Sequence, residues 1–494
     1  MICKKFSIPA PLIFTALFFP VTLRMLSVSC EAAVPPSIKF YFTDPLSATT
    51  SKSSLSCEDK AIDDALVDYI DSMPSGATAY LAIYEMNIPK IIDAFNSAAA
   101  RGVTIYAIGY STGTTPSDSS IYGLVGISTY TRVHTTQFMH NKFVVLKDSA
   151  VWTGSFNFSI SALQQDNNAV LIYSKELAQY YEKEFLNMWD TKNFSYAKST
   201  STVNSGDWNG KEVTVDGVKI KVYFNPYQNA VKNAILTELE GEDRATPPVI
   251  KPVKDVYVCM AWITESGVID TLKNLSGEGL TVCGVLDDSN TNWEAYYSFR
   301  NSSATFVFDS RKTNGGDGLL HHKFGVIDPG CVNGRVIMGS PNWSDSGITT
   351  SNTSNDENML IIYSPELSAI YYREFLRLFK ATGESVKTPS VSDIYKKAVS
   401  SVVVYPSPAR QQATIGYELS AYVTKVSVKI YSLSGEAVRE LTPQTIYPGL
   451  YNEITWDIKN SDGVRVAPGT YFIKVEAETP DGKYFLLKKT AVGK

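Results

Sequence analysis

The chain has 494 residues and a net charge of −5, with 44% apolar and 19% charged residues. This length predicts roughly two to four globular domains, and the composition is that of ordinary globular protein. The acidic balance lacks the basic footprint of most nucleic-acid-binding proteins. It weakens the case for a nucleic-acid substrate without excluding one.

The first predicted element is an export signal over residues 1–33. Two lysines near the start precede an apolar run at 8–23, and small residues follow. This layout is typical of a secretory signal peptide, with cleavage predicted after Ala32. A lipid anchor on Cys30 is the first alternative, but Ser27 stands where such anchors usually carry Leu. A membrane span is the second, but about 16 apolar residues are few for a span. The expected location is therefore secreted or in the cell envelope.

Removal of this signal would leave four cysteines, at positions 57, 259, 283 and 331. An exported protein could pair four cysteines in three ways. Cys259 and Cys283 lie in apolar runs that predict neighbouring strands, so buried free thiols are the favoured interpretation. No Cys-x-x-Cys pair or His/Cys cluster indicates a structural metal, and no cofactor is predicted.

The middle of the chain contains an internal repeat. HNKFVVLKD at 140–148 corresponds to HHKFGVID at 321–328, and GSFNFS at 154–159 corresponds to GSPNWS at 339–344. Each copy is preceded by an apolar run, a helical pattern and a second apolar run. That order predicts a βαβ unit with a buried parallel sheet in each copy.

The repeat therefore predicts two α/β lobes, residues 37–197 and 218–382, related by a pseudo-twofold axis. The Ser/Thr/Gly-rich segment 198–217 is interpreted as a linker between them. Each lobe ends in a predicted helix whose apolar residues recur every four positions, as expected of a face buried in the core. Ser174 and Ser364 are predicted N-caps of these two helices.

Two histidine–lysine pairs are the candidate site. In a strand, residues i and i+2 share a face, so His140 should project with Lys142, and His321 with Lys323. A pseudo-twofold could bring both pairs to one cleft. One imidazole could then attack a phosphodiester while the other protonates the leaving oxygen, and the ammonium groups would offset charge in the transition state. Neutral donors are predicted from the two Gly-Ser turns, namely Ser155, Asn157, Ser340 and Asn342.

These residues resemble the signature of the phospholipase D superfamily, which is His-x-Lys, four residues, Asp, a Gly-Ser/Asn turn and a later acidic residue. The second copy matches throughout, at His321, Lys323, Asp328, Gly339, Ser340, Asn342 and Glu357. The resemblance covers both lobes and implies an α/β fold with the active site between them. It also implies that His140 is the nucleophile, that His321 is the general acid, and that Glu357 orients His140 from the opposite lobe.

The first copy departs from this signature at the Asp position. Lys147 stands there, and Asp148 follows it. In the second copy Asp328 comes five residues after Lys323, which places it on the opposite strand face. We therefore predict that Asp328 is a structural anchor. In the first copy, the replacement of this aspartate by Lys147 should weaken the structural support, which Asp148 could restore. The catalytic chemistry should not be affected.

A second departure concerns the later acidic residue. Asn167 stands where the second copy has Glu357, and the neighbouring Asp166 is one residue out of phase. His321 would then be oriented by an amide, which stabilises an imidazolium less than a carboxylate does. A lower rate or a shifted pH optimum is expected.

The other two histidines receive no catalytic role. His322 should point away from His321, as a packed or solvated ring, and His134 is expected to stay outside the chemistry. The loops at 111–133 and 286–318 are expected to form walls of the substrate pocket.

Residues 401–494 follow a second predicted linker at 383–400. Short alternating runs separated by Ser-Gly, Pro-Gly and Asp-Gly turns predict a small all-β sandwich. The sequences YPSP, IYSLSG, WDIKNSDG and GTYFIKV resemble a FlgD-type Ig-like domain, and they are also similar to C-terminal sorting domains. The resemblance implies attachment to a cell surface or to secretion machinery, with an inert spacer as the alternative.

Three functions are consistent with these patterns. The leading hypothesis is an exported phospholipase D-like phosphodiesterase that hydrolyses phospholipids through a covalent phosphohistidine, without a metal. The first alternative is a metal-independent nuclease that uses the same residues. The second is a non-catalytic binding or adhesion protein, which the intact His-Lys pairs disfavour. Because one chain carries both lobes, a monomer is expected.

Overall fold

The computed structural model describes residues 36–45, 52–111, 113, 115–133, 137–199, 207–241, 255–312, 316, 318–330, 333–383, 398–419, 423, 425–443, 451–479 and 482–493. The expected signal at 1–33, most of the linker at 383–400, His134 and Cys331 lie outside these ranges. Among the described helices, none has the length and apolar character needed to cross a membrane.

The first lobe is built on a seven-stranded sheet in the order β1-β7-β6-β5-β2-β3-β4. Strands β2, β3 and β4 are parallel, and the other pairings are antiparallel. Helix α2 connects the parallel strands β2 and β3, which gives the predicted βαβ unit. The strands are β1 (Ile38–Phe42), β2 (Thr78–Ile83), β3 (Thr104–Ser111), β4 (Ser128–Val133), β5 (Lys142–Leu146), β6 (Ala150–Gly154) and β7 (Asn168–Tyr173).

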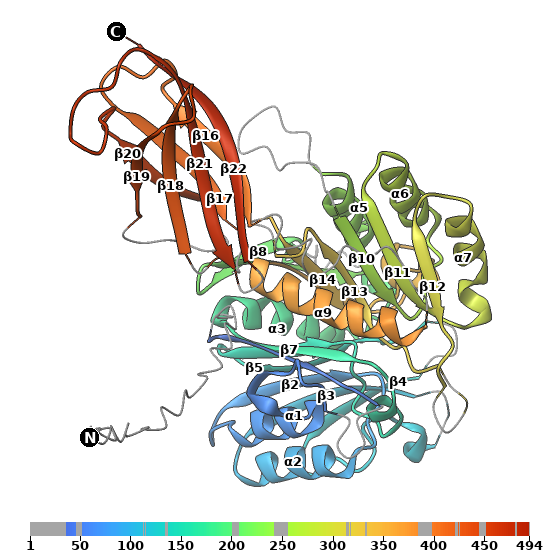
Figure 1. The fold of residues 1–494 in the computed structure, drawn as a ribbon. Helices are drawn as coiled ribbons and strands as arrows, with labels where there is room; N and C mark the ends of the chain where they lie inside the picture. The colour runs from blue at the N-terminus through green and yellow to red at the C-terminus, as the bar shows by residue number, and fades with distance from the viewer. Residues whose placement is uncertain are drawn as a thin grey trace, which may run out of the picture. The chain divides into compact units, whose positions relative to one another are not determined.

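Helices cover both faces of this sheet. Helices α1 (Ile62–Asp71) and α2 (Pro89–Ala100) share one apolar cluster with the residues of β2 that face them, such as Leu81. Helix α3 (Lys175–Thr191) packs on the other face, with Tyr80 of the same strand. Figure 1 shows α1 and α2 on the side of the sheet away from α3. Alternate residues of one strand thus enter two different cores, as expected of a sheet buried on both faces.

The second lobe repeats this architecture. Its eight-stranded sheet has the order β12-β11-β10-β13-β14-β15-β9-β8, in which the first seven strands follow the pattern of the first lobe. The strands are β8 (Lys211–Val215), β9 (Val218–Asn225), β10 (Asp255–Met260), β11 (Thr281–Asp287), β12 (Thr305–Asp309), β13 (Lys323–Ile327), β14 (Arg335–Gly339) and β15 (Glu357–Tyr363). The main helices are α5 (Ala230–Glu240), α6 (Ser266–Gly277), α7 (Trp293–Arg300) and α9 (Pro365–Ala381).

The interpretation of 198–217 as a linker needs correction at its C-terminal end. Residues 211–215 form β8, the edge strand of the second sheet, paired antiparallel with β9. Val213 and Val215 are buried in the core, which favours the paired strand over an open connector. Asp216 and Gly217 both have positive φ angles, and they form the tight turn between the two strands.

The two repeated helices begin where the sequence predicts. The Ser174 hydroxyl accepts a hydrogen bond from Leu177 N at the start of α3, and Ser364 accepts one from Leu367 N at the start of α9. The predicted apolar faces of both helices are buried in a single cluster with residues from both sheets. Ring contacts cross between the lobes within it, such as Phe42 with Tyr371 at 4.9 Å between centroids.

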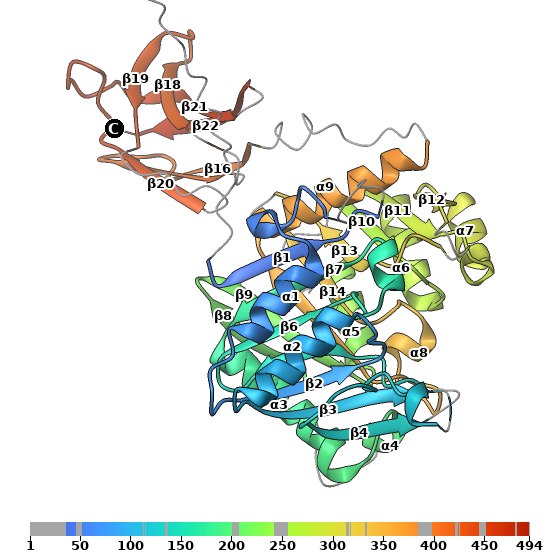
Figure 2. The same cartoon turned by 90° about the horizontal axis from the view of Figure 1, so that it is seen from below.

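The C-terminal region is an all-β domain, as predicted. Its strands form two sheets, in the orders β16-β17-β20 and β19-β18-β21-β22 (Figure 2), around an apolar core of their own. The strands are β16 (Val399–Tyr405), β17 (Ala413–Leu419), β18 (Lys425–Ser432), β19 (Ala437–Leu441), β20 (Tyr451–Trp456), β21 (Gly469–Thr479) and β22 (Gly482–Val492). In the lobes, Cys259 and Cys283 are buried free thiols.

Candidate active site

The two histidine–lysine pairs stand at equivalent places in the two sheets. Lys142 is the first residue of β5 and Lys323 the first residue of β13, both central strands. Lys142 is fully buried and donates to the carbonyl oxygen of His140 at 2.8 Å, while Lys323 donates to that of His321 at 3.0 Å. The ammonium group of each lysine is thereby held next to the main chain of its own histidine.

Main-chain hydrogen bonds bring the pairs together across the lobes. His140 N donates to the carbonyl oxygen of Asp356 at 2.9 Å, and His321 N donates to that of Asp166 at 3.1 Å. Each histidine is therefore bonded to a main-chain carbonyl of the opposite lobe. The residue that follows this carbonyl in the sequence is the one whose side chain orients the histidine ring. This reciprocal exchange is what places both imidazoles in one site.

The imidazole rings are oriented as the resemblance implies. Nδ1 of His140 lies 2.7 and 2.9 Å from the two carboxylate oxygens of Glu357. Nδ1 of His321 lies 2.7 Å from Oδ1 of Asn167. Since Nδ1 is engaged in both rings, Nε2 is the nitrogen that each histidine offers to a substrate.

The serines of the two Gly-Ser turns do not serve as the free donors we expected. Ser340 donates its hydroxyl to Glu357, and Ser155 donates to Asn167 Oδ1 at 3.0 Å. The turns press against the following strand, where a Cβ at Gly154 would meet a backbone oxygen at 2.2 Å. This close approach fixes each hydroxyl on the residue that orients a histidine, so the serines position the orienting groups.

The side chains of the two asparagines are not fully used in hydrogen bonds. Asn157 and Asn342 are both largely buried, and within the described part of the chain their Oδ1 atoms have no hydrogen-bond partner. Asn157 Nδ2 donates to a carboxylate oxygen of Glu85 at 3.3 Å. The sequence reasoning missed Glu85, which follows β2 and belongs to no motif. Comparison with Trp262, its counterpart in the repeat, could have singled it out.

Burial and like charge control the protonation of the site. Burial, followed by the charges of Lys142 and Lys323, holds the pKa of each site histidine well below its usual range. Burial likewise lowers the pKa of Lys142 to about 8 and raises that of Glu357 to about 7. Buried cationic groups of this kind are stabilised by an anion placed among them, which a phosphodiester would supply.

The aspartate of the signature lies at the far end of its strand. Asp328 accepts a hydrogen bond from Asp255 N at 3.0 Å and donates its own N–H to the Asp255 carbonyl at 2.9 Å, at the beginning of β10. In the first lobe Lys147 N makes the corresponding main-chain bond, to Thr78. Asp148 does not take over the side-chain contact, because its carboxylate accepts from Gln179 on α3 at 2.7 Å.

Asp166 and His322 belong to a buried ionic network outside the reacting groups. Asp166 is bound by Arg311 at 2.8 Å and by Arg377 at 2.5 Å, so it does not orient His321. His322 is a packed ring held by Glu374 at 2.9 Å. Ligand atoms of Asp166, His322 and Glu374 lie within 4.8 Å of one another, but guanidinium groups already neutralise both carboxylates, which disfavours a metal ion there.

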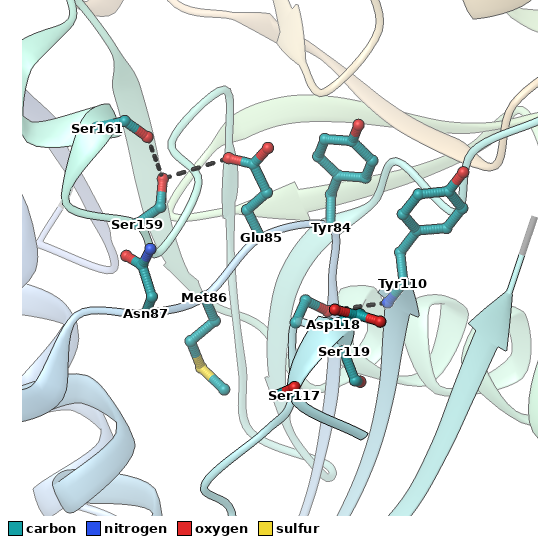
Figure 3. Close-up of a pocket in the computed structure, with 11 residues that line it drawn as sticks. Tyr84, Glu85, Met86, Asn87, Tyr110, Ser117, Asp118, Ser119, Ser159 and Ser161 are labelled. Carbon is teal, nitrogen blue, oxygen red and sulfur yellow. Dashed lines mark hydrogen bonds between the residues drawn. The ribbon is translucent and has the colours of Figure 1, made fainter. Parts of the chain in front are cut away.

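A cavity of about 380 Å³ is lined by residues that follow β2, among them Tyr84 and Glu85 (Figure 3). Tyr84 forms part of its wall, with its ring 4.9 Å from the His140 ring and 5.2 Å from Lys142 Nζ. The loop expected at 111–133 contributes another part of the wall. The residues that line the cavity are Tyr84, Glu85, Met86, Asn87, Tyr110, Ser117, Asp118, Ser119, Ser120, Ser159 and Ser161.

Comparison with known families gives two matches. Residues 69–189 and 250–379 match the family described as "Cardiolipin synthase, PLD-like domain". Residues 403–481 match the family described as "FlgD Ig-like domain". The first match contains every residue of both histidine–lysine pairs.

Similar curated proteins include a mitochondrial cardiolipin hydrolase of Chlamydomonas reinhardtii, 26% identical over 125 residues, which are 25% of this chain and 50% of that protein. A phospholipase D of Rickettsia prowazekii is 30% identical over 121 residues, which are 23% of this chain and 57% of that protein. The chain thus spans about half the length of these relatives.

Among solved structures, the phospholipase D family member Nuc of Salmonella typhimurium is 22% identical, with a TM-score of 0.26, and the match covers 31% of this chain and 94% of that one. The phosphatidylserine synthase of Haemophilus influenzae is 11% identical, with a TM-score of 0.45, covering 71% of this chain and 89% of that one.

Proposed function

Because the chain belongs to the phospholipase D superfamily, we propose that it is a phosphodiesterase that hydrolyses phospholipids through a covalent phosphohistidine, without a metal. The observation that carries this proposal is the convergence of two buried histidine–lysine pairs, each with its Nδ1 held from the opposite lobe. Relatives named cardiolipin hydrolase and phospholipase D support a lipid substrate.

The proposed reaction has two balanced steps. In the first, Nε2 of His140 attacks phosphorus and the bond to the leaving oxygen breaks, while His321 gives that oxygen a proton. In the second, His321 takes a proton from water, and the resulting hydroxide displaces His140. Glu357 stabilises the positive charge that the His140 ring carries in between.

The charge on the phosphoryl oxygens is offset by the protein itself. Lys142 and Lys323 supply two ammonium groups at the bottom of the site, and the amides of Asn157 and Asn342 add neutral polar groups. These groups take the part that a divalent cation takes in metal-dependent phosphodiesterases. Turnover in the presence of a chelator follows from this proposal.

An assay of the purified chain with EDTA tests the proposal. The substrates are vesicles of phosphatidylcholine or cardiolipin, with single-stranded DNA for the nuclease alternative. Turnover should persist in EDTA and be lost in His140→Ala and His321→Ala. His322→Asn is the matched control, because Asn141 occupies the equivalent position in the first lobe. Loss of turnover with EDTA, or its retention in both alanine variants, would contradict the mechanism. Cleavage of DNA alone would favour the nuclease.

The proposal includes export, which is supported by the signal-like sequence at 1–33 and by the match of residues 403–481 to an Ig-like domain. The C-terminal domain would then attach the enzyme to the cell envelope or its secretion machinery. Fractionation of cells that express the full chain tests this part. Recovery of the protein in the cytosol with residues 1–33 intact would exclude it.

A further inference from the structure

Glu85 stands beside the first histidine–lysine pair. Ile83 pairs with Lys142 at the end of β2, and the bond from Tyr84 N to the Asn141 carbonyl, 3.1 Å, continues this pairing by one residue. The next residues on the two strands are Glu85 and His140. Glu85, which is opposite His140 in this register, also lines the cavity (Figure 3).

The second lobe has a different residue at the equivalent position. Ala261 N bonds the His322 carbonyl at 2.9 Å, as Tyr84 N bonds Asn141. Trp343 N bonds the Trp262 carbonyl at 3.1 Å, just as Phe158 N bonds that of Glu85 at 2.9 Å. Trp262, which is 44% exposed, is thus the counterpart of Glu85.

Glu357 and Asn167 also differ between the lobes, but each contacts a site histidine. Within the described residues, the side chain of Glu85 instead forms hydrogen bonds with Asn157 and Ser159. The histidine, lysine, serine and asparagine of the site all occur in both lobes, whereas a carboxylate at this position occurs in the first lobe alone. The chemistry of a twofold site does not require it. A carboxylate that lines the cavity without contacting a site histidine is in a position to contact the substrate beyond its phosphate.

The cavity carries two carboxylates, those of Glu85 and Asp118. Burial lowers the pKa values of Lys142 and Lys323, and the charge of Glu85 acts on both in the opposite direction, raising them. Glu85 accepts from neutral donors, Asn157 Nδ2 at 3.3 Å and Ser159 Oγ at 3.4 Å. Asp118 accepts from Thr115 N at 2.9 Å, and hydrogen bonds from Thr115 lower its pKa. In the described part of the chain, neither carboxylate forms an ion pair with a cationic side chain. Direct contact with a cationic group is therefore left to a ligand.

Two aromatic rings complete the wall. Tyr84 and Tyr110 lie with their centroids 5.2 Å apart, and burial raises the pKa of Tyr84 to about 12, which keeps its phenol neutral. Carboxylates combined with the faces of aromatic rings are the groups that proteins use to bind alkylammonium ions. A second phosphate or a nucleic-acid backbone would be repelled by the same carboxylates.

We infer that this cavity binds an alkylammonium group of the substrate, with Glu85 as a specificity-determining residue. The inference rests on the proposed function and narrows it to phospholipids whose head group is cationic. Such a substrate places its phosphate among the histidines and lysines and its ammonium group beside Glu85. The opposite charges of the two neighbouring sites match the opposite charges of a zwitterionic head group.

The test compares substrates that differ in this cation. The full chain is assayed on phosphatidylcholine and phosphatidylglycerol in the same neutral detergent micelles, and on bis(p-nitrophenyl) phosphate, which carries no cation. In Glu85→Gln, kcat/KM for phosphatidylcholine should fall on the order of tenfold, the size expected when one charged contact is lost. The ratio of kcat/KM for phosphatidylcholine to that for each of the other two substrates should fall by a similar factor. Glu85→Lys should favour phosphatidylglycerol.

Glu176→Gln, an exposed carboxylate of the same lobe outside the cavity, is the matched control and should behave as the unmodified chain. Choline chloride should inhibit cleavage of bis(p-nitrophenyl) phosphate competitively, and more weakly in Glu85→Gln. An equal fall on all three substrates would show that Glu85 merely supports the charge of the lysines, and an unchanged substrate ratio would also overturn the inference. Failure of the unmodified chain to cleave any phosphodiester would refute the proposed function instead.

Discussion

The two site histidines differ in the charge of the residue that orients them. His140 faces a carboxylate, Glu357, while His321 faces the amide of Asn167. A carboxylate favours the protonated ring, whereas an amide oxygen accepts a hydrogen bond without adding negative charge. Asn167 of the first lobe therefore influences the pKa of His321, the proposed general acid.

Replacing this amide tests the point. In Asn167→Glu, the new carboxylate should raise the pKa of His321. The ring then stays protonated to higher pH, and the alkaline limb of the kcat/KM profile should move upward by about one pH unit. The measurement is a pH–rate profile beside that of the unmodified chain. If both the profile and the rate are unchanged, Asn167 does not control His321.

A second prediction concerns the serine that donates a hydrogen bond to each orienting residue. The hydrogen bond from Ser340 lowers the pKa of Glu357, which burial raises to about 7. In Ser340→Ala this pKa should rise further, so the carboxylate is lost at higher pH and the acidic limb of kcat/KM moves upward. Ser155→Ala is the matched control, because its partner Asn167 does not titrate, and its acidic limb should stay in place. Equal movement in both variants would contradict this assignment.

At the residue level, sequence reasoning reached the groups that lie within a repeated motif. The histidine–lysine pairs, Glu357 and Asn167 could be compared copy against copy. Glu85 lies outside these motifs, so only an alignment of the repeat that extends to Trp262 could have singled it out, and its approach to His140 depends on the register of β2 with β5. The occupied hydroxyls of the Gly-Ser turns were also hidden, since they depend on how closely two strands pack.

Among the strands and turns, Asp328 is the clearest structural anchor. It accepts from Asp255 N where β10 begins, far along the strand from Lys323. In Asp328→Ala the partly buried Asp255 amide loses this acceptor, so the free energy of unfolding should fall by about 1–2 kcal/mol. Denaturant unfolding measures this change, and kcat well below the unfolding temperature should persist.

Lys147→Ala is the comparison in the first lobe, where the lysine pairs with Glu182 near the surface. An exposed pair of this kind contributes about 0–1 kcal/mol, so the loss of stability should be smaller. A loss of kcat in Asp328→Ala without a loss of stability would assign Asp328 to the chemistry instead.

The elements also show where local patterns mislead. Ser174 and Ser364 were recognisable as N-caps because a capping side chain acts within one turn of its own helix. Strand β8 was overlooked because the Ser, Thr and Gly residues before it suggested an open connector. The Asp216-Gly217 turn between two alternating runs was the available indication of a hairpin.

For the whole molecule, buried charges join the two lobes on both sides of the site. Asp166 of the first lobe is held by Arg311 and Arg377 of the second. Asp356 of the second lobe pairs at 2.9 Å with Lys198, which also pairs with Glu184 on α3 of the first lobe. Both aspartates precede the residues that orient the histidines, so these ion pairs fix the cleft as well as the interface.

Removal of one guanidinium should therefore destabilise the whole molecule. Arg377→Met leaves Asp166 and Glu374 buried with less positive charge, and about 3–5 kcal/mol of unfolding free energy should be lost. Burial alone would raise the pKa of Glu374, but hydrogen bonding and charge from Arg377 lower it to about 2. This group stabilises the fold above its unfolded pKa, and that contribution is lost as the pH falls towards 2.

The variant should accordingly unfold in acid at a higher pH than the unmodified chain. Urea and acid titrations followed by circular dichroism measure both effects. Arg373→Met, an exposed arginine on the same helix, is the control and should change stability by less than about 0.5 kcal/mol. Similar losses in the two variants would mean that the network does not hold the lobes.

The exchange of main-chain bonds between His140 and Asp356, and between His321 and Asp166, has one more consequence. A lobe that dimerised with an identical copy would form a cleft that is the same from either end. Joining two copies in one chain allows positions 85 and 262 to differ on the two sides. The cleft then has a direction: under the proposed function, a phosphodiester with two unlike substituents would favour one orientation, and that orientation would determine which phosphorus–oxygen bond breaks.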